Sequence, residues 1–100
     1  MAVSNIIVWN PKDKIGHWQE EFQNENPIHV EVGMGKGAFL KGMAEKYPDI
    51  NFIGIEKYDS VVARAVEHIG DIPNIRIIRM NALEIDEVFN HEVERLYLNF

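Results

Sequence analysis

An acidic residue stands two positions before a group of glycines, at the point where an apolar run ends. The run ends at Val32, the glycines are Gly33, Gly35 and Gly37, and the acid is Glu31. Glycines let the backbone turn sharply and approach a ligand closely, and the free N–H groups of a following helix point at the same place. A nucleotide-type cofactor is therefore expected in this turn.

The charge of Glu31 narrows the choice of cofactor. A pyrophosphate would bring like charge close to the carboxylate, whereas S-adenosylmethionine brings an ammonium, a sulfonium and no phosphate. We therefore expect S-adenosylmethionine, bound by Glu31 and the three glycines. A dinucleotide is the alternative, because Gly33 to Ala38 satisfies the G-x-G-x-x-A spacing.

A second acid, Glu56, follows the next apolar run. The carboxyl ends of neighbouring parallel strands open onto one crevice, so this carboxylate is placed to accept both hydroxyls of an adenosine ribose. The structural alternative is an acid that caps the next helix near Asp59. We expect Glu56 to bind the cofactor.

Asn81 and Ala82 follow a third apolar run and reach the same crevice. The Asn81 amide is able to hydrogen-bond an adenine edge while the backbone of residues 81–83 lies against the ring. A turn-forming Asn is the alternative interpretation.

Apolar runs alternate with helical periods along the chain, which predicts right-handed βαβ units and a parallel sheet covered on both faces. This is an α/β fold. The predicted strands are Ile28–Val32, Asn51–Ile55, Ile75–Ile78 and Leu96–Phe100, and the predicted helices are Phe39–Tyr47, Val61–Ile69 and a shorter Leu83–Phe89.

Residues 1–27 precede this pattern and are predicted to form an N-terminal helical segment, separate from a nucleotide-binding part at residues 28–100. Asp13–Phe22 is typical of one amphipathic helix with Ile15, Trp18 and Phe22 on one face. The simpler expectation is packing against the sheet edge. The alternative is that Trp9 or Trp18 lines the mouth of the cofactor site.

Composition limits the remaining possibilities. The chain has 100 residues, 46% of them hydrophobic, which allows one small core. It has no cysteine and no long apolar stretch, so we expect a cytoplasmic protein without disulfides or a membrane segment. Its four histidines show no metal-ligand spacing, so no metal is expected. A net charge of −6 argues against a broad nucleic-acid surface on these residues.

Three stretches, Ile28–Gly37, Pro48–Glu56 and Arg95–Phe100, closely resemble bacterial tRNA (guanine-N7-)-methyltransferases. The resemblance implies a Rossmann-like methyltransferase sheet with strand order 3-2-1-4. It also implies methyl transfer from S-adenosylmethionine to N7 of a guanine in the tRNA variable loop. Glu31, Glu56 and Asn81 align with cofactor contacts of the family, the last of which is usually Asp.

The sequence also departs from that family. There, Leu-Asn-Phe runs into Ser-Asp-Pro-Trp-Pro and a basic stretch, whereas this sequence ends at Phe100 and lacks the basic N-terminal arm. We therefore expect the cofactor-binding part of a longer enzyme, with an incomplete sheet. The catalytic residues are unknown, tRNA contacts lie mostly elsewhere, and the isolated part is expected to be inactive. An NAD-dependent oxidoreductase domain and a non-catalytic nucleotide-binding module remain the alternatives.

Overall fold

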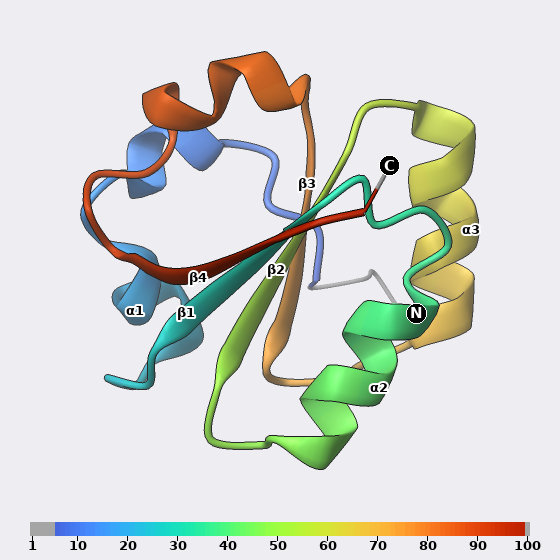
Figure 1. Ribbon diagram of the computed structural model, residues 1–100, viewed down its shortest axis with the longest axis horizontal. Coiled ribbons are helices and arrows are strands. Elements are labelled where there is room, and N and C mark those ends of the chain that lie inside the picture. Colours follow the sequence, from blue (N-terminus) through green and yellow to red (C-terminus); the bar gives the residue numbers. More distant parts are fainter. Residues whose placement is uncertain (1–5, 100) are drawn as a thin grey trace.

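The computed structural model describes residues 6–99, in which four parallel strands lie in the order β3-β2-β1-β4. Figure 1 shows this sheet edge-on between its helices. The strands are Ile28–Val32 (β1), Asn51–Glu56 (β2), Ile75–Arg79 (β3) and Val93–Leu98 (β4). The helical elements are Pro11–Lys14 (η1), Trp18–Phe22 (α1), Ala38–Lys46 (α2), Asp59–Ile69 (α3) and Ala82–Glu87 (η2). The α/β class and the predicted strand order are confirmed.

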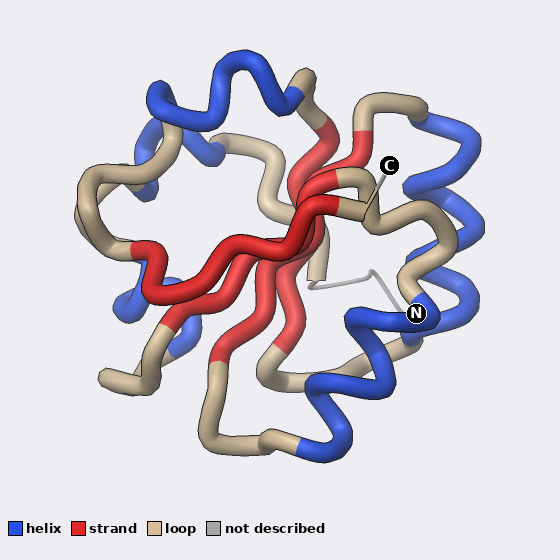
Figure 2. Tube along the Cα trace, viewed as in Figure 1, coloured by secondary structure: helices blue, strands red, loops and turns tan. Residues whose placement is uncertain are grey.

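Helical elements cover both faces of the sheet (Figures 1 and 2). On one face α2 and α3 pack over a core that includes Leu40, Phe52 and Ile77. On the other face the N-terminal segment and η2 pack over a core that includes Trp18 and Val30. Strand β1 is buried at all of its positions, because both of its faces are covered.

The helices α2 and α3 follow the predicted signals. α2 begins after Gly37 and ends before Pro48, which disfavours a helical conformation of the preceding Tyr47. α3 ends at Gly70, whose N–H donates to the Val66 carbonyl at 2.9 Å and whose φ is +71°. Both helices thus end where the sequence predicts.

The prediction of a single helix from Asp13 to Phe22 is wrong. The segment forms the 3-10 turn η1 and the short helix α1, with Gly16 between them at φ +77°. The Glu92 carboxylate, far away in the sequence, accepts hydrogen bonds from the N–H groups of Gly16 at 2.7 Å and Trp18 at 3.2 Å. This tertiary contact satisfies the N–H groups that a continuous helix would use, and it leaves Ile15 38% exposed.

Two further boundaries differ from the predictions. Strand β4 begins at Val93, three positions before the predicted start, and ends at Leu98; Phe100 lies outside the described residues. The predicted helix at Leu83–Phe89 is instead the 3-10 element η2, which ends at Glu87. The Phe89 side chain belongs to the core instead, with its ring 5.3 Å from that of Trp18.

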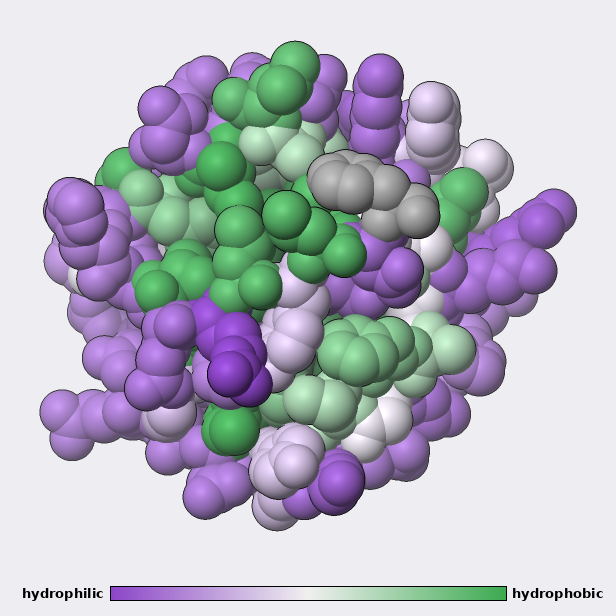
Figure 3. Space-filling model, viewed as in Figure 1, coloured by the Kyte–Doolittle hydropathy of each residue, from purple (hydrophilic) through white to green (hydrophobic). Residues whose placement is uncertain are grey.

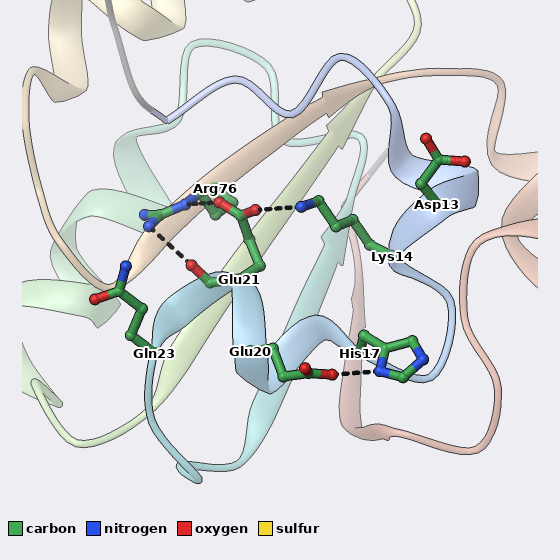
Figure 4. A pocket seen from close by; sticks show the side chains of 7 residues that line it. All are labelled: Asp13, Lys14, His17, Glu20, Glu21, Gln23 and Arg76. Atoms are coloured by element: carbon green, nitrogen blue, oxygen red, sulfur yellow. Dashed lines mark hydrogen bonds and ion pairs between the residues drawn. The ribbon is translucent and has the colours of Figure 1, made fainter.

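The N-terminal segment is bonded to the outer strand β3. Residues 6–8 run parallel to it, with the Val8 N–H donating to the Ile77 carbonyl at 2.9 Å. Figure 4 shows a second link, in which Glu21 lies between Arg76 of β3 at 2.9 Å and Lys14 at 3.0 Å. Partial burial opposes the charged form of Glu21, but hydrogen bonds from Arg76 and Lys14 outweigh it and lower its pKa.

The buried Trp18 provides a test of this packing. Its side chain is 0% exposed, and its Nε1–H donates to the Val88 carbonyl at 2.7 Å. Trp18→Ala should lower the free energy of unfolding by about 3–5 kcal/mol, because it leaves a cavity and an unpaired carbonyl. Trp9 is 78% exposed, and Trp9→Ala should change this energy by less than about 0.5 kcal/mol. Urea unfolding followed by circular dichroism compares them; equal losses would contradict this packing.

Candidate functional site

The glycine turn folds back over the end of β2. The N–H groups of Gly33 and Met34 both donate to the Ile55 carbonyl, at 3.0 and 3.2 Å. Gly35 has φ +59° and open space where a Cβ would stand. A Cβ on Gly37 would lie 2.6 Å from the Ile69 side chain. Gly37 also has φ +83°, a conformation that favours glycine, and a Cβ there would displace the tip of the Ile69 side chain, while Gly35 leaves room at the turn.

The Glu56 carboxylate lies directly beside this turn. One oxygen accepts from the Gly35 N–H at 3.1 Å, and the other accepts from the N–H groups of Lys57 at 3.1 Å and Tyr58 at 3.3 Å. Tyr58 is the N-cap residue of α3, so one of these bonds lies immediately before the helix. Glu56 thus connects the glycine turn to the β2–α3 turn that leads into the helix of the alternative interpretation.

Four of the predicted site residues line one cavity of about 220 Å³ at the carboxyl ends of the strands. They are Gly33, Glu56, Asn81 and Ala82, and the remaining walls are Val32, Ile55, Lys57, Tyr58 and Met80. The side-chain amide oxygen of Asn81 (Oδ1) accepts from the Leu83 N–H at 3.0 Å, which caps η2. Its turn-forming role is therefore real, and its N–H₂ group is the one that a ligand would contact.

Glu31 lies on the other side of β1, away from this cavity. It lines a separate hollow of about 440 Å³ with Phe39, Leu96, Tyr97, Leu98 and Asn99. In Figure 3 hydrophobic side chains gather over β4, where Leu96 and Leu98 are exposed. The structure therefore does not bring Glu31 into one cavity with Glu56. Glu31, in β1, is bonded toward β4 through Asn99, whereas Glu56 ends β2, the neighbour of β1 on the other edge.

The Glu31 carboxyl group is 0% exposed, and only one of its oxygens has a partner. Asn99 donates to Oε2 at 3.1 Å, whereas Oε1 has no hydrogen-bond partner among residues 6–99. Burial raises the pKa of Glu31 above its ordinary value, and the bond from Asn99 partly opposes this. Ionisation in the folded protein is therefore costly unless a cation contacts Oε1.

The raised pKa has a consequence for stability. Because the pKa of Glu31 is higher in the folded than in the unfolded chain, the group contributes fully to stability below the ordinary value of 4.5. This contribution is lost as the pH rises through the raised pKa. At neutral pH the Glu31 carboxylate therefore destabilises the unliganded fold, and a bound cation would reverse this effect.

Asn99 was not predicted as a site residue. The sequence feature that could have indicated it is a polar side chain within the otherwise apolar run Tyr97-Leu98-Asn99-Phe100. Of the two tryptophans in the alternative prediction for the N-terminal segment, Trp18 is fully buried and Trp9 is 78% exposed. Trp9 lines a hollow with Arg79 and Met80, next to the cavity that contains Glu56.

The remaining polar groups do not form a further centre. His29 lies between the Tyr97 hydroxyl and Glu94, each at 3.2 Å from a ring nitrogen. Within residues 6–99 no three His, Cys, Asp or Glu side chains are grouped to hold a metal ion. In the same residues, no helix is long and apolar enough to cross a lipid bilayer.

Known proteins share this sequence and fold. Residues 25–100 match the protein family described as "Putative methyltransferase". A tRNA (guanine-N(7)-)-methyltransferase of Lysinibacillus sphaericus is 50% identical over 99 residues, which are 95% of this chain and 46% of that protein. The enzyme of the same name from Lachnoclostridium phytofermentans is 47% identical over 100% of this chain and 48% of its own length. The chain thus spans about half the length of these relatives.

A solved structure shares the fold. The plantazolicin methyltransferase BamL, in complex with a triazolic desmethylPZN analog and SAH, matches 76% of this chain and 27% of its own. The TM-score is 0.53 at 20% sequence identity, so the likeness concerns the Rossmann-like methyltransferase fold alone. The resemblance to tRNA (guanine-N7-)-methyltransferases is confirmed along the whole chain, and the family match covers most of it. This chain belongs to the family described as "Putative methyltransferase".

Proposed function

We propose that this chain is the cofactor-binding part of a cytoplasmic tRNA (guanine-N7-)-methyltransferase that uses S-adenosylmethionine. The observation that carries the proposal is Glu31 Oε1, which is buried and has no hydrogen-bond partner among residues 6–99. Glu31 belongs to β1, and the cavity that contains Glu56 opens beside the end of the same strand, at Val32 and Gly33. The Glu31 carboxylate would thus provide an anion for an ammonium group, and the cavity at Glu56 would provide hydrogen-bond acceptors for an adenosine. The names of the relatives at 45–50% identity support the transfer to tRNA guanine.

The residues fit S-adenosylmethionine group by group. Glu31 Oε1 would accept the ammonium, and Asn81 and Ala82 would contact the adenine. A carboxylate has about four acceptor positions, and Glu56 uses three of them for backbone N–H groups. One ribose hydroxyl would therefore take the remaining position, and a second would replace the 3.3 Å bond from Tyr58.

The chemistry requires orientation more than proton transfer. The bound cofactor supplies an electrophilic methyl group, and guanine N7 already carries a lone pair that needs no general base. The residues of this chain would hold and orient the methyl donor, which is the main source of acceleration for such a step. With a net charge of −6 on these residues, we infer that tRNA is bound mostly by other parts of the protein.

The first prediction from the proposed function concerns Glu56. Glu56→Gln should weaken binding of both S-adenosylhomocysteine and 5′-methylthioadenosine by about 1.5–3 kcal/mol, because both ligands carry the adenosine ribose. Calorimetric titration measures both affinities. Glu67→Gln on the exposed side of α3 is the matched control and should change neither. Unchanged affinity in a folded Glu56→Gln variant would remove Glu56 from the site.

A second prediction concerns the pH dependence of binding. Affinity for S-adenosylhomocysteine should rise with pH above 4.5 until Glu31 is ionised, because the charged carboxylate pairs with the ligand ammonium. Glu31→Gln should flatten this profile, while 5′-methylthioadenosine, which has no ammonium, should show none of it. Titrations between pH 5 and 8 provide the comparison. Tighter binding of NADH than of S-adenosylhomocysteine would support the oxidoreductase alternative instead.

A third prediction tests the reaction. The full-length protein with S-adenosylmethionine should form N7-methylguanosine in tRNA, detected by mass spectrometry of the digested nucleosides. A tRNA transcript that contains 7-deazaguanosine should accept no methyl group, because the nucleophilic nitrogen is missing. Methyl transfer to the 7-deaza transcript, or to another base of the normal tRNA, would contradict the proposal.

A further inference from the structure

Asn99 is tied to the same short stretch of β1 by two hydrogen bonds. Its backbone N–H donates to the Val32 carbonyl at 2.9 Å, which continues the β1–β4 pairing one position beyond Leu98. Its side-chain N–H₂ group donates to Glu31 Oε2 at 3.1 Å. The backbone bond therefore fixes the place from which the side chain reaches the carboxylate.

The amide is chemically suited to this place. It donates a hydrogen bond without bringing a charge, so the full negative charge of Glu31 stays available for a ligand. A lysine here would neutralise the carboxylate and compete with a ligand cation, and an aspartate would repel it. The bond also occupies one oxygen of the carboxylate and thereby orients the other, Oε1, which is buried without a partner.

We propose that Asn99 is a positioning residue for the cofactor-binding site, which holds the Glu31 carboxylate so that Oε1 accepts the ammonium group of the methyl donor. This inference rests on the proposed function. It makes the end of β4 part of the site, although Asn99 itself is at the surface and need not contact the ligand.

The test compares four proteins: wild type, Asn99→Ala, Glu31→Gln and the variant with both substitutions. S-adenosylhomocysteine is titrated by calorimetry between pH 5 and 8.5, and 5′-methylthioadenosine serves as the ligand without an ammonium. Asn99→Ala removes a hydrogen bond that lowers the pKa of Glu31. The curve of affinity for S-adenosylhomocysteine against pH should therefore move to higher pH by about one unit. Affinity for S-adenosylhomocysteine should therefore fall about tenfold at the acid end and less at the alkaline end.

The combined variant shows whether Asn99 acts through Glu31. In the Glu31→Gln background, Asn99→Ala should have no further effect on S-adenosylhomocysteine, because the partner it orients is already changed. Affinity for 5′-methylthioadenosine should stay unchanged in all four proteins. Asn99→Asp keeps the side-chain shape and should shift the profile further than Asn99→Ala, since two carboxylates then share the position.

Three results would overturn the inference, and they separate its failure from that of the proposed function. An unchanged profile in Asn99→Ala, while Glu31→Gln weakens S-adenosylhomocysteine, would overturn the role of Asn99 alone. An equal loss from Asn99→Ala with and without Glu31→Gln would show that Asn99 does not act through Glu31. Wild-type protein that binds neither ligand would overturn the proposed function and, with it, this inference.

Discussion

A carboxyl group with only one hydrogen-bond donor lies buried on an inner strand of this sheet, and the proposed site depends on it. Glu31 belongs to β1, which is paired with β2 on one side and β4 on the other. Its charged form lacks water and has one neutral donor, Asn99. Such a group destabilises the free protein at neutral pH and gains most from a bound cation. In the proposed function, this cost to stability is what would favour a ligand that brings an ammonium group.

The position of β1 explains how the two halves of the site are joined. On the β2 side the glycine turn is hydrogen-bonded to the Ile55 carbonyl and to the Glu56 carboxylate, which links the turn to the end of β2. On the β4 side Asn99 is bonded to Val32 and Glu31. A ligand that contacts both sides must therefore pass over the glycine turn, where Gly35 leaves open space.

Local signals predicted most of the sheet and much of the site. The apolar runs located all four strands, and Pro48 and Gly70 marked the ends of α2 and α3, because these signals act on their own neighbours in the sequence. The turn glycines and Glu56 were predicted from their spacing. Their cooperation was not predicted, since the bond from the Gly35 N–H to Glu56 depends on tertiary packing, as does the lack of free space for a Cβ at Gly37 beside Ile69.

The errors occur where distant residues decide the local structure. The helix predicted at Asp13–Phe22 is broken because Glu92 accepts hydrogen bonds from the N–H groups of Gly16 and Trp18. The role of Asn99 was missed for the same reason, since only the pairing of β4 with β1 brings it to Glu31. Neither contact has a local sequence pattern that would reveal it.

The most direct test of the central claim is the ionisation of Glu31 itself. In carbon-13 labelled protein, the chemical shift of the Glu31 side-chain carboxyl reports its pKa as the pH is varied. The account predicts a pKa above the ordinary 4.5 in the free protein, and a fall in that pKa when S-adenosylhomocysteine is added at saturating concentration. A pKa that is ordinary in the free protein, or that does not change when the ligand binds, would contradict it.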